Sequence, residues 1–138
     1  MPQPRYELKG SRFWIVDEEL GIDVSGEVAE LHGPSMQYGP GGVLLSESWF
    51  FHGKKMGRVL RYALDGSLLS REGFVEGVPH LMQEHFYPGG GVRARVPYNM
   101  GVLEGTVELF WQNGALKRKG HYVSGKLQEE EFFDAALS

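Results

Sequence analysis

Residues 86–125 of the chain read FYPGGGVRARVPYNMGVLEGTVELFWQNGALKRKGHYVSG, and this stretch contains the same pattern twice. In each copy an aromatic residue is followed four residues later by glycine and six residues later by an aliphatic residue. A second aromatic and a second glycine complete the copy. The pattern returns every 24 residues from Tyr38 onward, so four copies cover residues 38–133. A repeat of this length indicates an architecture of stacked, similar units.

Five columns of the repeat are filled in all four copies. These columns are the first aromatic (Tyr38, Tyr62, Phe86, Phe110), the first glycine (Gly42, Gly66, Gly90, Gly114), the aliphatic (Leu44, Leu68, Val92, Leu116), the second aromatic (Phe50, Phe74, Tyr98, Tyr122) and the second glycine (Gly53, Gly77, Gly101, Gly125). Side chains six residues apart lie on the same face of a strand, so the aliphatic and the second aromatic form ladders along one face. We therefore predict one β-hairpin per unit, stacked in an antiparallel meander.

Glycine marks the turns between these strands. The chain has 20 glycines in 138 residues, about twice the average frequency. Asp65-Gly66 and Asn113-Gly114 are flanked by strand-like runs, and we predict type I′ turns there, with positive φ at both central residues. The second column of glycines suits the left-handed position of the return turns. The predicted fold class is all-β.

The segments outside the four repeats are assigned to the same domain. Residues 11–37 resemble a degenerate hairpin repeat and are predicted to cap the N-terminal end of the array. Its strands are expected at residues 12–16 and 22–31. Residues 134–138 are predicted to form a short tail, and the whole chain of 138 residues is predicted to be a single domain.

Composition excludes several classes of protein. The chain has no cysteine, so it has no disulfide framework and no thiolate nucleophile. Its formal net charge of −4 argues against a nucleic-acid partner. We find no signal-peptide-like apolar segment at the N-terminus and no apolar run long enough to span a membrane, so a cytoplasmic location is expected.

Two copies of the repeat resemble a known family. Phe-Tyr-Pro-Gly-Gly-Gly-Val at 86–92 and Phe-Trp-Gln-Asn-Gly-Ala-Leu at 110–116, each followed by Tyr-x-x-Gly, resemble the bacterial variant of the MORN repeat. The glycine that usually opens the next strand is replaced by Leu81 and by Glu129. The resemblance implies a β-sheet scaffold that binds a partner, and bacterial members include YwqK-like antitoxins and immunity proteins. A repeat of this kind specifies a scaffold rather than a chemistry.

No residue pattern indicates catalysis. His32 and His80 share a repeat column but stand two units apart, and the five histidines lack the ligand spacing of zinc motifs. The three glycines at 89–91 belong to a hairpin turn with no helix after it, so they do not form a phosphate loop. We therefore expect no catalytic, cofactor-binding or metal-binding residues, no cofactor and no enzymatic activity.

The face opposite the apolar ladders contains the candidate partner-binding residues. They are Arg71, Arg93, Arg95, Lys117, Lys119, Trp49 and Phe51. Arg71, Arg95 and Lys119 share one column and form a basic stripe, which suits either a solvated sheet face or contact with an acidic partner. Trp49 and Phe51 form an apolar cluster that either a partner or the N-terminal segment would cover.

The sequence therefore predicts a non-catalytic protein-binding repeat module, specifically an antitoxin or immunity protein that covers a cognate toxic effector. The alternative is a scaffold, or a peripheral protein that binds anionic lipid headgroups through the basic stripe. Nucleic acid is not an expected partner. A homodimer, in which a second copy closes the apolar face, remains an open alternative.

Overall fold

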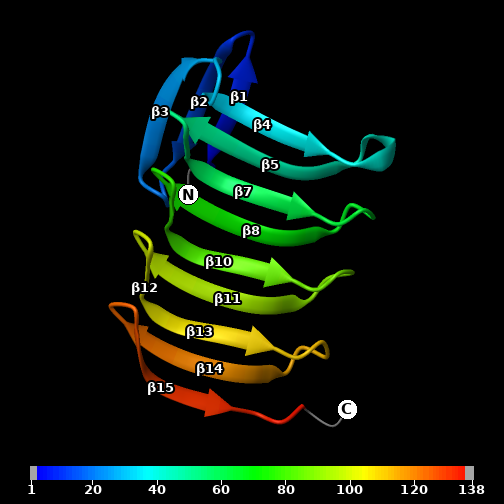
Figure 1. The fold of residues 1–138 in the computed structure, drawn as a ribbon, viewed down its shortest axis with the longest axis vertical. Coiled ribbons are helices and arrows are strands. Elements are labelled where there is room, and N and C mark those ends of the chain that lie inside the picture. The colour runs from blue at the N-terminus through cyan, green and yellow to red at the C-terminus, as the bar shows by residue number, and fades with distance from the viewer. Residues whose placement is uncertain (1–2, 136–138) are drawn as a thin grey trace.

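The computed structural model describes residues 3–135, which form two antiparallel β-sheets (Figure 1). The smaller sheet consists of β1 (Arg5–Lys9), β2 (Arg12–Asp17) and β3 (Ile22–Glu27). The larger sheet has twelve strands. They are β4 (Gly33–Tyr38), β5 (Leu44–Phe51), β6 (Lys54–Lys55), β7 (Gly57–Tyr62), β8 (Leu68–Val75), β9 (Val78–Pro79), β10 (Leu81–Phe86), β11 (Val92–Asn99), β12 (Val102–Leu103), β13 (Gly105–Phe110), β14 (Leu116–Val123) and β15 (Lys126–Phe132). A short 3-10 turn, η1 (Pro40–Gly42), links β4 to β5.

The large sheet confirms the predicted meander of stacked hairpins. The hairpins β4–β5, β7–β8, β10–β11 and β13–β14 follow one another across the sheet, and β15 pairs beyond the last of them. The first hairpin begins at Gly33 rather than Tyr38, so β4 belongs to the array and not to the cap expected at 11–37. Of the tail expected at 134–138, residues 136–138 lie outside the described residues.

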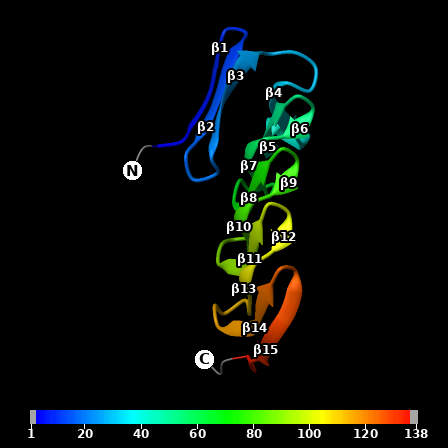
Figure 2. The ribbon, with the colours of Figure 1, turned by 90° about the vertical axis from the view of Figure 1, so that its left-hand side faces the viewer.

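The N-terminal strands do not cap the end of the array. The strand expected at 12–16 forms as β2, and the one expected at 22–31 forms as β3 but ends at Glu27. An additional strand, β1, pairs with β2 on its other side and was not predicted. Figure 2 shows this small sheet lying against one face of the large sheet at its N-terminal end. Burial alternates along β2, so Phe13 and Ile15 share one fully buried face of the strand. The segment therefore forms a second layer.

The closed core lies between the two sheets. Its buried members are Phe13, Ile15, Leu20, Ile22, Trp49 and Met56. Trp49 retains 4% of its exposed surface, and the partly buried Phe51 packs against the same core. Of the two alternatives for this apolar cluster, the structure has the N-terminal segment covering it. Trp49 is therefore buried within the protein and not available to a partner.

The two faces of the large sheet differ in how they are covered. We call the face that bears Trp49 and Arg71 the Trp49 face, and the opposite face, which bears the second aromatics of the repeat, the Phe74 face. The aliphatic and aromatic ladders predicted for the Phe74 face are partly buried in each unit. Within residues 3–135 no second layer packs over them, so the enclosed core formed on the other side of the sheet.

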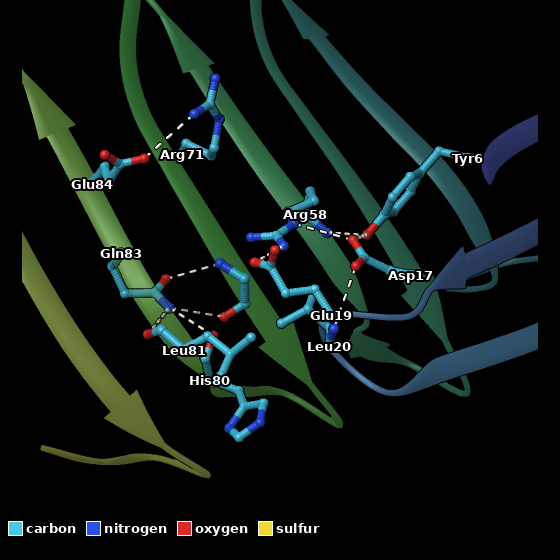
Figure 3. Close-up of polar contacts among 11 residues, drawn as sticks. Tyr6, Asp17, Glu19, Leu20, Arg58, Arg71, His80, Leu81, Gln83 and Glu84 are labelled. Atoms are coloured by element: carbon cyan, nitrogen blue, oxygen red, sulfur yellow. Dashed lines mark hydrogen bonds and ion pairs between the residues drawn. The ribbon is translucent and has the colours of Figure 1, made fainter. Parts of the chain in front are cut away.

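A buried polar network holds the two sheets together (Figure 3). Asp17 is 1% exposed and accepts hydrogen bonds from the hydroxyl of Tyr6 at 2.7 Å and from Nε of Arg58 at 3.1 Å. The backbone N–H of Arg58 donates to the same Tyr6 hydroxyl at 2.9 Å. Arg58 also pairs with Glu19 at 2.8 Å. A buried carboxylate is stable when it is paired and hydrogen-bonded in this way, and removal of one partner leaves an uncompensated charge.

The first turn of each hairpin is not the type I′ turn that we predicted. Gly66 has φ 89°, but Asp65 keeps a negative φ. The N–H of Gly66 donates to the carbonyl of Ala63 at 2.9 Å, and the N–H of Ala63 donates to the carbonyl of Ser67 at 2.8 Å. These bonds define a three-residue loop, a type I turn followed by a left-handed glycine. The side chain of Asp65 stabilises it by accepting from the N–H of Ser67 at 2.9 Å.

The type I′ geometry occurs instead at the second glycine. Both central residues have positive φ in all four return turns: His52-Gly53, Glu76-Gly77, Met100-Gly101 and Ser124-Gly125. The flanking residues are directly paired, as Val75 is with Val78, so two-residue loops connect the strands. The twist of a type I′ turn matches the right-handed twist of the strands, which explains why two-residue loops adopt it. The left-handed position predicted for the second glycines is confirmed.

The glycine that usually opens the next strand is replaced by Leu81 and by Glu129, and the backbone differs at these two positions. Leu81 keeps the positive φ of the column, at 68°, and packs against the core. The buried amide of Gln83 holds this backbone in place by donating to the carbonyls of His80 at 3.0 Å and Leu81 at 3.1 Å (Figure 3). Glu129 instead lies within the continuous strand β15.

We predict that Gly57→Ala destabilises the protein through contact between the sheets. Gly57 has φ 97°, and an added Cβ would lie 2.6 Å from the ring of Tyr6. The left-handed backbone and the overpacking together should lower the free energy of unfolding by about 3 kcal/mol, as measured by urea denaturation. Gly105→Ala is the matched control, because Gly105 has φ 113° but its Cβ would meet only Pro97 at 3.3 Å. Equal losses in the two variants would contradict a role for Tyr6.

We predict a second, pH-dependent effect at Tyr6. Burial, and the hydrogen bond that its hydroxyl donates to Asp17, raise the pKa of Tyr6 well above its ordinary value of 10.0. The unfolded chain therefore releases this proton at lower pH than the folded chain. The stabilisation is fully present below pH 10 and should decline above it by about 1.4 kcal/mol per pH unit.

The variant Tyr6→Phe lacks this hydroxyl and supplies the control. Its deficit in the free energy of unfolding, about 1–3 kcal/mol near neutral pH, should shrink as the pH rises above 10. Urea denaturation of both proteins between pH 8 and pH 11 measures the difference. A deficit that stays constant across this range would contradict the assignment.

Candidate partner-binding surface

The three residues of the predicted basic stripe lie in one row across the Trp49 face, but acids alternate with them. The pairings Arg71↔Glu84, Glu84↔Arg95, Arg95↔Glu108, Glu108↔Lys119 and Lys119↔Glu131 connect five neighbouring strands and β15 in a single line. Glu84 pairs with Arg71 at 3.3 Å and with Arg95 at 3.4 Å. The row holds three bases and three acids, so its formal charges cancel. The stripe is a ladder of alternating charge and not a basic surface.

The second strands alone show only the bases of this row, because its acids come from the first strands and from β15. Each hairpin loop has three residues and is followed by a bulge, so an odd-numbered residue of the second strand pairs with an even-numbered residue of the first. Arg95 and Glu84 are one such pair. Acids at even positions of the first strands therefore lie beside bases at odd positions of the second. The number of loop residues was the signal that could have revealed this.

Arg93 and Lys117 stand apart from this row. They occupy the bulges of β11 and β14, where the register shifts beside the hairpin loop, and both are exposed. The ammonium of Lys117 lies 4.6 Å from the centre of the Trp111 ring, a cation–π contact. Phe51 packs against the core. The seven predicted residues therefore divide into a charged row, two bulge residues and two core-facing aromatics.

The Phe74 face carries a shallow hollow of about 230 Å³. Its lining includes Phe74, Gln83, His85 and Tyr98. Nearby acids are paired: Glu72 lies 3.5 Å from Arg61. The hollow is amphipathic and continues the aromatic ladder, so this face offers apolar contact area between fixed ion pairs.

A further ion pair lies at the C-terminal end of the same face. Arg118 donates to both carboxylate oxygens of Glu130 at 3.1 Å and to the hydroxyl of Tyr122 at 3.3 Å. The bond from Arg118 lowers the pKa of Glu130, and the Glu130 carboxylate raises the pKa of Arg118. Both charges are therefore firmly maintained near neutral pH, and the bidentate geometry fixes Glu130 in place.

His32 and His80, which share a column of the repeat, accept hydrogen bonds from the backbone of the return turns. This structural role was not predicted from the sequence. Nδ1 of His32 accepts the N–H of His52 at 3.2 Å, and Nδ1 of His80 accepts the N–H of Met100 at 2.9 Å. In the last unit the acceptor is a carboxylate, as Glu104 accepts the N–H of Ser124 at 3.0 Å. Each acceptor stands 20 residues before the left-handed residue that it caps.

These caps fasten one unit to the next. The glycine of each return turn also donates to a backbone carbonyl of the preceding unit, as Gly101 does to Pro79 at 2.7 Å. Two bonds therefore secure the return turns that follow His32, His80 and Glu104. In the second unit the column holds Met56, which is buried in the core.

Among residues 3–135, no three His, Cys, Asp or Glu side chains lie close enough together to hold a metal ion. No helix among these residues is long and apolar enough to cross a membrane.

The fold and its surface define a β-hairpin repeat protein, with a second layer packed on one end of the sheet. Residues 103–123, from β12 to the end of β14, match the family model described as MORN repeat variant. This match confirms, over these residues, the resemblance to the MORN repeat variant found in the sequence. No curated protein and no solved structure matches the chain. MORN repeats generally take part in interactions with proteins or membrane lipids.

We predict that the acceptor at position 80 can be exchanged between the two types found in the column. His80→Ala should lower the free energy of unfolding by about 1–2 kcal/mol, because the N–H of Met100 loses its acceptor. His80→Glu should retain most of this stability, since Glu104 caps Ser124 in the same way. Urea denaturation measures both. An equal loss in the two variants would show that the imidazole packs and does not cap.

Proposed function

We propose that this protein is a non-catalytic protein-binding repeat module. The observation that carries the proposal is the row of alternating charge on the Trp49 face. Such a row presents a fixed order of bases and acids on a rigid sheet, so it can distinguish one partner surface from another. Stacked hairpins held by backbone bonds and caps also lose little conformational entropy on binding.

The same observation favours a protein partner over an anionic membrane. A membrane attracts clustered basic residues, each worth about 1 kcal/mol near the surface. In the row, Glu84 and Glu108 stand beside every base that would contribute, and Glu131 ends it. Of the five basic candidate residues, Arg93 and Lys117 alone lie outside the row, and two bases attract an anionic surface less than five would.

The finer proposal is that the partner is a toxic effector and that this protein is its cytoplasmic antitoxin or immunity protein. It rests on the resemblance to the bacterial variant repeat and on the absence of any catalytic motif recognised in the sequence. The mechanism would be occlusion: a rigid sheet face covers the effector surface that the effector needs for its activity.

We predict that co-expression with the product of the adjacent gene yields a complex that co-purifies and relieves that product's toxicity. Size-exclusion chromatography of the pair and growth of the co-expressing cells provide the two measurements. If no complex forms and toxicity is not relieved, the antitoxin proposal is refuted. Sedimentation with vesicles containing anionic lipid, if binding rises with anionic content and vanishes in salt, would support the lipid-binding alternative instead.

Within such a complex, the charged row should carry part of the affinity. The double variant Arg95→Gln and Lys119→Gln should weaken binding about tenfold and reduce its salt dependence. Arg12→Gln is the matched control, because Arg12 is an exposed base on the small sheet, 3.5 Å from Glu27 and outside the row. Isothermal titration calorimetry at two salt concentrations compares them. Unchanged affinity in the double variant would exclude the row from the interface.

A further inference from the structure

The strand β4 forms one edge of the large sheet. In the strand order of the described residues, β4 pairs with β5 and lies at the end of the path. An edge strand presents unpaired N–H and C=O groups that can bond to another extended chain. The structure shows which of its residues face outward and what surrounds them.

Met36 directs its backbone groups away from the sheet. The carbonyl of Trp49 accepts the N–H of Met56 at 2.8 Å, on the side of β5 that faces β7. In an antiparallel ladder the two backbone groups of one residue point to the same side. Pro34 is paired with Trp49, so it points away from β5, and Met36, two residues later, points the same way. Pro34 has no N–H, which leaves Met36 as the central outward donor and acceptor of β4.

The two edges of the large sheet differ in charge. β15, at the other edge, carries Lys126 and the acidic run Glu129 to Glu131, charges of the kind that discourage strand addition. β4 has no charged residue, and among residues 28–43 the one Asp, Glu, Lys or Arg is Glu30. A charged strand would therefore find no counter-charge along β4. An uncharged strand would pair there without a desolvation penalty for ions.

Exposed apolar side chains and a hollow accompany this edge. Met36 and Tyr38 of β4 are exposed, with 36% and 64% of their surface accessible, and so are Val28 and Leu31 of the preceding loop. A cavity of about 240 Å³ beside the strand is lined by Val28, Leu31 and Pro34, among others. It is large enough to receive an apolar side chain from a neighbouring strand.

The small sheet limits what can dock against this edge. In Figures 1 and 2 its upper end extends beyond β4, on the side of the Trp49 face. A folded partner, a second copy included, must clear this overhang. A single extended segment occupies only the plane of the large sheet, in line with β4.

We propose that the β4 edge binds one extended, uncharged segment of a partner protein as an additional antiparallel strand. This inference deepens the proposed protein-binding function and rests on it. Backbone bonds to Met36 supply affinity, and an apolar side chain of the partner enters the hollow beside Val28 and Leu31. Selection among partners arises from the pattern of alternate side chains, as in other cases of strand addition.

The test uses the full-length protein and a phage-displayed library of random nonapeptides. Enriched peptides are synthesised and their Kd values measured by fluorescence anisotropy against three proteins: the wild type, Met36→Pro and Met36→Leu. Met36→Pro removes the outward donor, while Met36→Leu keeps it with an apolar side chain. We expect uncharged peptides, with affinity at least tenfold weaker on Met36→Pro and nearly unchanged on Met36→Leu. Amide exchange of Met36, measured by NMR, should slow at least tenfold when a peptide binds.

Several outcomes would overturn the proposal. No enriched peptide, enrichment of charged peptides, or equal affinity for wild type and Met36→Pro would each do so. Concentration-dependent dimerisation that Met36→Pro abolishes, seen by analytical ultracentrifugation, would assign the edge to a second copy instead. Should Met36→Pro fail to fold, Met36→Lys supplies a different comparison: it keeps the donor but places a charge on the edge, and peptide affinity equal to that of the wild type would likewise overturn the proposal.

The result is separable from the test of the proposed function. A complex with the adjacent gene product that forms equally well with Met36→Pro would refute strand addition and leave the binding function in place. Peptide capture at β4 without such a complex would refute that choice of partner and leave the edge site in place.

Discussion

The buried contact of Asp17 with Arg58 and Tyr6 determines which surface of this protein is free. It joins β2 of the small sheet to β7 of the large one, beside the apolar contacts of Phe13 and Ile15 with the Trp49 face. Because this carboxylate is almost fully buried, the two sheets cannot slide past each other without leaving a charge unpaired. The N-terminal units are therefore covered on one face, and partners must use the rest of the array or its edge.

The repeat itself is maintained by its return turns as much as by its strands. Between consecutive hairpins the paired register is short, as with Ser46↔Arg61 and Glu47↔Leu60 between β5 and β7. The glycine of each return turn adds a backbone bond to the unit before it, and three of the four turns add a side-chain cap. Stability of such an array is approximately the sum of units and their interfaces, so these turn contacts strengthen every interface in which they occur.

The exposed surfaces differ in what they can recognise. The row from Arg71 to Glu131 is rich in charge but neutral overall, so it favours a partner with a matching order of charges. The β4 edge offers backbone groups and apolar side chains with almost no charge. The two surfaces could be used by one partner or by two, since they lie at different parts of the sheet. Both depend on a rigid backbone that presents fixed groups and needs little rearrangement.

The sequence by itself determined the hairpin repeat, because columns of glycine, aromatic and aliphatic residues report directly on turns and on strand faces. It also placed Arg71, Arg95 and Lys119 in one row correctly, since they share a column of the 24-residue repeat and equivalent residues of stacked units align. It did not place Glu84 or Glu108 between them, because cross-strand register depends on the loop length and the bulge, and the predicted type I′ turns gave the wrong loop length. Nor could it place β1 to β3 on the Trp49 face rather than at the end of the array. Their own pairing satisfies local rules in both arrangements, and the burial of Trp49 and Asp17 between the two sheets decided between them.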